Sequence, residues 1–197
     1  MIGDLMPVIA AIITALATLA SVLLGQKFMK RKEKDCIVRE TAQNANVYAA
    51  LQYLMEEMKA DRAYIMEFHN GDVYFSGRGQ QKFSCTHEVV EEGISAECEF
   101  SQNHRISNYH HYINQMINDG RYFFKNVEEV SDRTFYQMIN KKGIESIYNV
   151  PIKTLSGKIV GILGVDYVKG KMPDVDNVND THSFMKRQAR TIAGYLI

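Results

Sequence analysis

The stretch from Leu5 to Leu24 contains no charged side chain, and a cluster of basic residues follows it directly. A helix needs about 20 apolar residues to cross the hydrocarbon core of a bilayer. A segment of this length and composition is typical of a membrane-spanning helix rather than of a helix in a soluble core. We therefore expect residues 1–26 to form a transmembrane anchor.

The order of charges around this stretch predicts its orientation. A secretory signal peptide has basic residues before its apolar run, whereas this chain has Asp4 there. The basic residues that follow are Lys27, Lys30, Arg31, Lys32 and Lys34. By the positive-inside rule, we expect a single pass through the inner or cell membrane, with the N-terminus outside and the folded domain in the cytoplasm. Two alternatives stay open: a soluble protein with an apolar first helix, and a helix buried in a protein assembly instead of lipid.

Composition argues against several functional classes. The chain has 23 Lys and Arg against 23 Asp and Glu, so it lacks the net positive charge of a nucleic-acid-binding protein. Cys36, Cys85 and Cys98 are widely spaced and form no C-x-x-C pair. Cys85 and His87 would share one face of a predicted strand and could meet Cys98, but the spacing of these residues does not favour a zinc site. We expect no metal, no cofactor, no catalytic group and no enzyme activity.

A long connecting helix is predicted over residues 27–60, which contain neither Pro nor Gly. Its residues with 4-3 spacing form a heptad-like stripe: Ile37, Thr41, Asn44, Tyr48, Leu51, Met55 and Met58. The stripe fits an amphipathic helix lying on its own domain, and it equally fits a parallel dimer that continues out of the membrane. With the small residues Ala11 and Ala15 inside the span, it favours a homo-oligomer formed through residues 5–58.

The middle of the chain alternates between strand and helix patterns. Residues 63–68 predict a strand that stops at an Asn70-Gly71 turn, and residues 82–90 predict a second strand. A helix is expected over residues 108–118, with Gly120 as its cap, and a second short helix follows Ser131-Asp132.

The last third predicts a strand hairpin and a closing helix. Strands are expected over residues 144–153 and 158–168, joined by a tight turn, and Asp180 or Thr181 should cap the final helix. The inward stripe of this helix is predicted to be Phe184, Gln188, Thr191, Ile192 and Tyr195. These elements predict an α+β fold in which helices from both chain ends pack on one face of an antiparallel sheet and the middle segments cover the other.

Two segments resemble GAF domains: DRAYIMEFHNG at residues 61–71 and GIESIYNVPIKTLSGKIVGILGVDYV at residues 143–168. The resemblance assigns residues 61–197 to a GAF-like domain. It implies a six-stranded antiparallel sheet, back helices that commonly pair two protomers, and a front pocket roofed by the middle helices. The N-K-F-D-E motif of cyclic-nucleotide-binding members and the cysteine arrangement of bilin-binding members are absent from the sequence.

The same resemblance implies a ligand pocket rich in aromatic side chains. The candidate pocket residues are Phe68, His69, Tyr74, Phe75, Tyr109, Tyr112, Phe123 and Tyr148. We expect a membrane-anchored sensor or binding module that couples a small-molecule ligand or protein partner to helix packing and oligomer state. Membrane lipid and a second copy of the chain are the other expected partners.

A second, looser resemblance gives an alternative function. One N-terminal span, a helix and a closing helix containing RQARTIAGYL are similar to the holin of T-even bacteriophages. That family places the soluble domain in the periplasm, opposite to the orientation that the basic cluster predicts. A holin-like lysis protein and a structural assembly protein with a hydrophobic N-terminal helix are therefore the alternatives.

Overall fold

The computed structural model describes the backbone of residues 5–170, 172 and 178–197, and the side chains of residues 11–27, 36–170, 172 and 180–197. Contacts between residues divide the chain into two compact units, residues 1–43 and 44–197. One helix, α1 (Leu5–Met58), has residues in both units. The domain boundaries that we place near residues 26 and 60 stay predictions.

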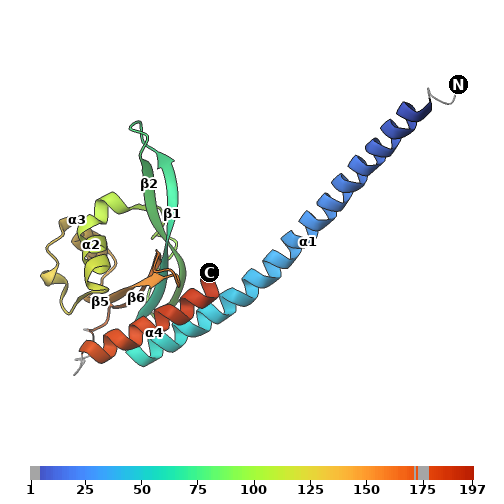
Figure 1. Ribbon diagram of the computed structural model, residues 1–197. Helices are drawn as coiled ribbons and strands as arrows, with labels where there is room; N and C mark the ends of the chain where they lie inside the picture. Colours follow the sequence, from blue (N-terminus) through green and yellow to red (C-terminus); the bar gives the residue numbers. More distant parts are fainter. Residues whose placement is uncertain (1–4, 171, 173–177) are drawn as a thin grey trace. The chain divides into compact units, whose positions relative to one another are not determined.

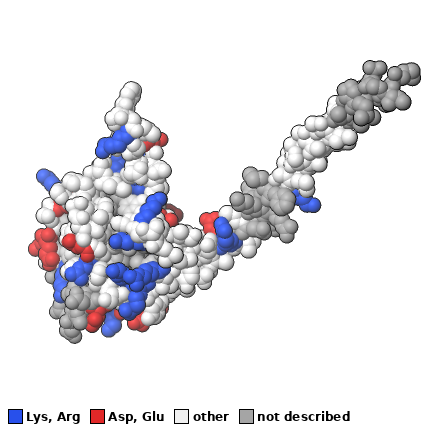
Figure 2. Space-filling model, in the orientation of Figure 1, with Lys and Arg blue, Asp and Glu red and all other residues white. Residues whose placement is uncertain are grey.

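In the first unit, apolar side chains of α1 are exposed on all sides. Ile13, Leu16 and Leu23 have exposed fractions of 61%, 61% and 58%, and Figure 2 shows the described stretch before Lys27 without charged side chains. Across the described side chains, no helix combines the length and the apolarity that a membrane crossing requires. The side chains of residues 5–10, within the predicted span, and of residues 28–35, within the basic cluster, lie outside the described set.

The second unit is built on a six-stranded sheet in which neighbouring strands are antiparallel, in the order β3-β2-β1-β6-β5-β4. The strands are β1 (Arg62–Val73), β2 (Gly79–Val90), β3 (His104–Arg105), β4 (Tyr122–Phe124), β5 (Ser146–Lys153) and β6 (Ile159–Tyr167). The first and the last strand along the chain, β1 and β6, thus pair in the centre of the sheet. This confirms the predicted α+β class and the six-stranded antiparallel sheet.

Helices cover both faces of this sheet (Figure 1). We call the side under α2 (His110–Asp119) and α3 (Arg133–Lys141) the front face, and the side under residues 44–58 of α1 and under α4 (Val178–Leu196) the back face. Two short 3₁₀ helices, Ile106–Tyr109 and Val127–Glu129, flank the front helices. The predicted arrangement of helices around the sheet is confirmed.

Each face has its own hydrophobic core. The back core contains Leu51, Leu54, Ile152, Leu163, Met185 and Ile192, and the front core contains Phe83, Met116, Phe135, Ile139 and Ile162. Strand residues alternate between the two sides, so β5 places Ile147 in the front core and Val150 in the back core.

Two of the three predicted helix caps form, whereas the cap predicted at Asp180 or Thr181 is wrong because α4 already begins at Val178. Gly120 ends α2 with φ +69°, a left-handed conformation that glycine adopts without steric cost. Asp132 starts α3, and its carboxylate accepts hydrogen bonds from the backbone N–H groups of Thr134 and Phe135. These caps fix the ends of the two front helices.

The predicted Asn70-Gly71 turn is wrong. Strand β1 continues to Val73, with an irregularity in its pairing between Asn70 and Val73. The chain reverses further on, where the N–H of Gly77 donates to the carbonyl of Tyr74 and Gly77 has φ +77°. The glycine that allows the reversal is therefore Gly77, and the Asn-Gly pair lies in the strand.

The stripe on α1 is used by its own domain over its last three turns. Of the stripe, Leu51 and Met55 are buried in the back core and Met58 packs against it, whereas Ile37 and Tyr48 are 65% and 44% exposed. Val47 and Leu54, which lie outside the predicted stripe, are also buried there. The amphipathic interpretation of the helix therefore holds for residues 47–58. Dimer formation through residues 5–58 stays a prediction.

The inward face of α4 also differs from its predicted stripe. The buried residues of α4 include Met185, Ala189, Ile192 and Ala193, while Thr191 is exposed. Of the predicted stripe, Ile192 is buried, and Phe184, Gln188 and Tyr195 are half-buried. The buried face of α4 is therefore shifted by about one residue from the predicted stripe, toward Met185, Ala189 and Ala193.

Candidate functional site

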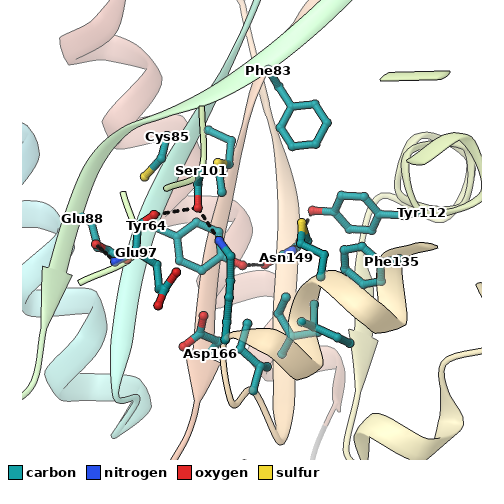
Figure 3. A pocket seen from close by; sticks show the side chains of 16 residues that line it. Tyr64, Phe83, Cys85, Glu88, Glu97, Ser101, Tyr112, Phe135, Asn149 and Asp166 are labelled. Atoms are coloured by element: carbon teal, nitrogen blue, oxygen red, sulfur yellow. Dashed lines mark hydrogen bonds between the residues drawn. The ribbon is translucent and has the colours of Figure 1, made fainter. Parts of the chain in front are cut away.

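The front face encloses a small cavity beneath the lid formed by α2 and α3. Its lining comes from β1, β2, β5, β6, the two lid helices and the loop that follows β2 (Figure 3). Its volume is about 30 Å³, which leaves room for about one or two water molecules. The residues around it form an apolar half and a polar half.

A chain of hydrogen bonds crosses this cavity from the sheet to the lid. The hydroxyl of Tyr64 donates to Asn149 Oδ1 at 3.0 Å, and Asn149 Nδ2 donates to the hydroxyl of Tyr112 at 2.7 Å. Tyr112 belongs to α2 and stacks on Phe135 of α3 with ring centroids 4.4 Å apart. The amide of Asn149 therefore hydrogen-bonds α2 to the sheet, and the stacked rings of Tyr112 and Phe135 extend this link to α3.

Burial changes the acid–base behaviour of this chain. Asn149 is 1% exposed, and burial raises the pKa of both Tyr64 and Tyr112 well above the usual range. Both tyrosines therefore stay protonated at neutral pH and act as hydrogen-bond donors or acceptors.

Glycine 164 makes room for this chain. A Cβ atom at Gly164 would lie 2.3 Å from Asn149 Oδ1 and 2.4 Å from the ring of Tyr64. Gly164 is the last residue of the run G-x-x-x-G-x-L-G at residues 157–164, so this pattern has a physical role in the chain. Its last glycine lets a tyrosine from β1 lie across the backbone of β6.

A buried ion pair lies at the bottom of the polar half. Arg62 of β1 and Asp166 of β6 are register partners, and Arg62 Nε donates to Asp166 Oδ1 at 2.7 Å. The other guanidinium nitrogens donate to the carbonyl oxygens of Ser95 and Lys142. Arg62 is 1% exposed, so its charge depends on these partners.

The two members of this pair respond differently to burial. Burial raises the pKa of Asp166 to about 6, although Arg62 and Lys142 attract its ionised form. Burial lowers the pKa of Arg62, but Asp166 more than compensates, and the net direction is upward. The arginine therefore keeps its charge, and the carboxylate is the member whose charge responds to its surroundings.

Lys142 brings a second cation to the cavity at the end of α3. Its ammonium group donates to the hydroxyl of Ser101, which in turn donates to the carbonyl of Glu97 at 2.7 Å. Burial lowers the pKa of Lys142, although Glu97 and Asp166 favour its charged form. The lysine therefore ties the lid to the loop that follows β2.

That loop, residues 91–103, is held by Glu88. Its carboxylate accepts hydrogen bonds from the backbone N–H groups of Glu97 and Cys98, at 2.7 and 2.9 Å. Gln102 Nε2 donates to the carbonyls of Cys85 and Cys98. Burial raises the pKa of both thiols, so neither cysteine is prepared as a nucleophile.

Cys85 and His87 lie on opposite faces of the sheet, contrary to the expectation that they share one. The pairing of β2 with β1 passes from Cys85 to His87 and leaves Thr86 as an extra, bulged residue. Cys85 is therefore in the front core, while His87 contacts Asn44 and Tyr48 of α1. Among the described residues, no group of three or more His, Cys, Asp or Glu side chains is placed to hold a metal ion.

The structure distributes the eight candidate pocket residues over several places. Tyr112 lines the cavity, and Tyr109 and Phe68 belong to the front core or pack against it. Phe123 and Tyr148 stack on each other and contribute to the back core. Whether any of the eight contacts a ligand stays a prediction.

The remaining three candidates belong to the β1–β2 hairpin. His69 Nε2 and the Ser84 hydroxyl form a hydrogen bond of 2.8 Å between the two strands. Tyr74 packs under the guanidinium of Arg78, and Phe75 is fully exposed at the tip.

The polar half of the cavity is absent from the candidates chosen by sequence. Its lining members are Glu88, Glu97, Ser101, Lys142, Asn149 and Asp166, and Arg62 pairs with Asp166 behind the lining. Two of them carried a signal, because Asn149 and Asp166 are the polar residues inside otherwise apolar strands. Lys142 and Ser101 lie in segments with no such pattern, and the fold alone brings them together.

Comparison with known proteins identifies the fold. No family model matches the chain, and no curated protein sequence matches it. The GAF3 domain from Slr1393 of Synechocystis sp. PCC6803 is similar in structure, with 12% identity over 78% of this chain and 92% of that chain and a TM-score of 0.59. The PixJ GAF domain of Thermosynechococcus elongatus gives 12% identity over 80% of this chain and 86% of that chain, with a TM-score of 0.61.

A third similar structure contains a ligand. It is the far-red absorbing dark state of JSC1_58120g3 with bound biliverdin IXa. The identity is 10% over 74% of this chain and 84% of that chain, and the TM-score is 0.55. At these identities the similarity establishes the fold alone. The second unit of this chain has a GAF fold.

Proposed function

We propose that this chain is a sensor or binding module whose front cavity opens to admit a small polar ligand. The observation that supports this function best is the hydrogen-bonded chain from Tyr64 through Asn149 to Tyr112. These buried hydrogen bonds lie inside a lid-covered site of a GAF fold. Function then depends on binding and conformational change rather than on catalysis.

The size of the cavity requires the lid to move. Sites for drug-sized ligands have volumes of about 300–1,000 Å³, whereas the cavity measures about 30 Å³. A ligand larger than a few atoms can enter only when the bond between Tyr112 and Asn149 breaks. A ligand shifts a conformational equilibrium only by its difference in affinity for the two states. Its contacts in the open state must therefore compensate for the free energy of the lost hydrogen bond between Tyr112 and Asn149.

The charges around the cavity favour a small polar ligand over a bilin. Arg62 and Lys142 supply donors, and Asp166 and Glu97 supply acceptors at the same end. The sequence also lacks the cysteine arrangement expected of a bilin-binding member. We therefore do not extend the biliverdin of the similar structure to this chain.

Strand β5 offers a route by which lid movement reaches the back helices. Asn149 faces the lid, while its neighbours Tyr148 and Val150 pack in the back core with α1 and α4. A shift of the strand that follows the lid would therefore change the packing under these helices. We propose that this packing change is the output, and that it alters the association of two protomers.

Membrane anchoring is the other part of the proposal. The run from Leu5 to Leu24 has no charge, and the large apolar side chains described within it are at least half exposed. A helix that is apolar on all sides is stable only when lipid or protein covers it. The holin-like alternative shares this requirement, and the similar structures do not bear on it.

The experiment is a thermal-shift screen of the full chain in mild detergent against nucleotides, amino acids, carboxylic acids and sugar phosphates at millimolar concentration. We expect at least one of these small polar compounds to raise the unfolding midpoint. Replacing Tyr112→Phe removes the hydroxyl that holds the lid but keeps the ring stacked on Phe135. Because the open state then costs less free energy, the compound should bind about 2- to 10-fold more tightly to this variant.

Tyr109→Phe is the matched control, since Tyr109 lies in the same front core and its hydroxyl contacts His104 instead of Asn149. Its affinity should equal that of the unmodified chain. A screen in which no compound shifts the midpoint would contradict the proposal. Equal affinities for the two tyrosine variants would contradict the role of the lid.

A further inference from the structure

A groove on the back of the second unit is far larger than the front cavity. It lies between α4 and the hairpin formed by β5 and β6, and its volume is about 730 Å³. That volume falls within the range of small-molecule sites. The groove shares no lining residue with the front cavity.

The groove has an apolar base and a basic rim. Its buried apolar residues are Val150, Pro151, Ala189 and Ala193. Its exposed cations are Lys153, Lys186 and Arg190, and the described residues that line it include no Asp or Glu. Figure 2 shows a group of Lys and Arg side chains over α4. An apolar surface beside cations is suited to a molecule with an apolar part and an anionic part.

The positive charges at one end of the groove affect the pKa of His182. Burial lowers the pKa of His182, and the nearby charges of Arg121 and Lys186 lower it further. Its Nδ1 atom is buried without a hydrogen-bond partner among the described residues. An anion bound beside Lys186 would offset the positive charges of Arg121 and Lys186 and so raise the pKa of His182.

A glycine in α4 keeps the groove open. Gly194 lines the groove, and a Cβ atom at this position would meet no atom within 4 Å. Glycine inside a helix is less stable than alanine, so the local backbone gives no reason for it. Because Gly194 is itself a lining residue, a longer side chain at this position would take up space in the groove.

We propose that this groove binds an anionic amphiphile, a single apolar chain with a phosphate or carboxylate head group. The apolar chain would lie along Val150, Ala189 and Ala193, and the head group would pair with Arg190 and Lys186. A charged head at the exposed rim keeps its contact with water, and the tail leaves water, so neither part is buried in unfavourable surroundings. The proposal is independent of the function proposed for the front cavity.

The test is isothermal titration calorimetry of the full chain with hexyl phosphate, a short amphiphile that carries both features. Inorganic phosphate and 1-hexanol supply the head and the tail separately. We expect hexyl phosphate to bind at least tenfold more tightly than either of them. We also expect the pKa of His182, followed by NMR, to rise when hexyl phosphate is bound.

Two pairs of variants distinguish binding in the groove from non-specific electrostatic attraction to the protein surface. Arg190→Glu should weaken binding at least tenfold, whereas Arg187→Glu makes the same charge change on the same helix outside the groove lining and should change it less than twofold. Gly194→Phe should abolish binding while keeping the unfolding midpoint. Gly194→Ala, which adds one methyl group, should keep both.

Several results would overturn the proposal. Equal affinity for hexyl phosphate and inorganic phosphate would indicate a simple anion site. Equal losses in the two arginine variants would indicate long-range attraction. Binding that weakens as the protein concentration rises would indicate that a second copy occupies the groove, and competition by an acidic peptide but not by 1-hexanol would indicate a peptide site.

Discussion

At the scale of single residues, the front site depends on Gly164, which has no side chain. Tyr64 crosses β6 at Gly164 and reaches Asn149, so three residues from three strands share one small volume. Any Cβ atom at Gly164 would displace the ring or the amide. The glycine is therefore required by packing, and its backbone needs no left-handed conformation.

We predict that Gly164→Ala lowers the free energy of unfolding by about 1–3 kcal/mol, because the added methyl group overpacks a filled site. The measurement is equilibrium unfolding in urea. Gly170→Ala is the matched control, since a Cβ atom there meets nothing within 4 Å, and it should stay within about 0.5 kcal/mol of the unmodified chain. Equal stability of the two variants would show that Tyr64 has another position available.

The residues of the site could be predicted from sequence only in part. Aromatic content led to Tyr112, which lines the cavity, but also to Phe123 and Tyr148, which lie on the other face. The candidates fall on both faces because strand residues alternate between faces, and one residue of uncertainty in register moves a side chain to the other side. Lys142 reaches Ser101 from a segment far along the chain, and no local pattern contains that information.

At the scale of elements, β2 and α1 are joined by one histidine. Asn44 Oδ1 is an acceptor, so His87 Nε2 carries the proton in their 3.1 Å hydrogen bond. His87 Nδ1 then accepts from the hydroxyl of Thr86 at 3.0 Å. Both ring nitrogens are satisfied in the neutral state, and the ring also contacts Tyr48 of α1 edge-on.

This contact predicts a loss of stability in mild acid. Burial lowers the pKa of His87 below its usual value of 6.5, although Glu67 opposes this. The unfolded chain therefore takes up the proton first, and the stabilisation is present above pH 6.5 and lost as the pH falls below it. We expect the free energy of unfolding to fall between about pH 7.5 and 5.5, by less than about 1.4 kcal/mol per pH unit for this one group.

The measurement compares urea unfolding of the unmodified chain and of His87→Gln at several pH values. Glutamine can still donate to Asn44 but does not titrate, so the variant should lose less stability on acidification. His110→Gln changes an exposed histidine of α2 and should keep the original pH dependence. Identical pH profiles for the His87 variant and the unmodified chain would exclude this role.

Elements were predicted well where the pattern was long and its ends carried caps. The hairpin of β5 and β6 and the helices α2 and α3 follow from apolar runs bounded by Gly157, Gly120 and Asp132. The bulge at Thr86 and the continuation of β1 through Asn70-Gly71 were not predictable in this way. Both depend on the register of a partner strand, which overrides local turn preference.

At the scale of the whole molecule, the question is what covers the first part of α1. In the second unit the helix buries Val47, Leu51 and Leu54 in its own domain. In the first unit Ile12, Leu16 and Leu19 are each more than half exposed. Exposed apolar surface of this extent is unfavourable in water, so we expect lipid or a second protein surface to cover it.

We predict that the full chain fractionates with membranes and resists extraction by alkaline carbonate. The double variant Leu16→Lys with Leu19→Lys should move it to the supernatant, because a lysine at the centre of a span costs about 2.5–3.5 kcal/mol. Leu16→Ala with Leu19→Ala is the control: it shortens the same two side chains without adding charge, and it should stay in the membrane fraction. If the helix is covered by protein instead, the unmodified chain will appear in the supernatant as a large oligomer that the lysine variant breaks. A detergent-free monomer of the unmodified chain would contradict both forms of cover, and with them the proposed membrane anchoring.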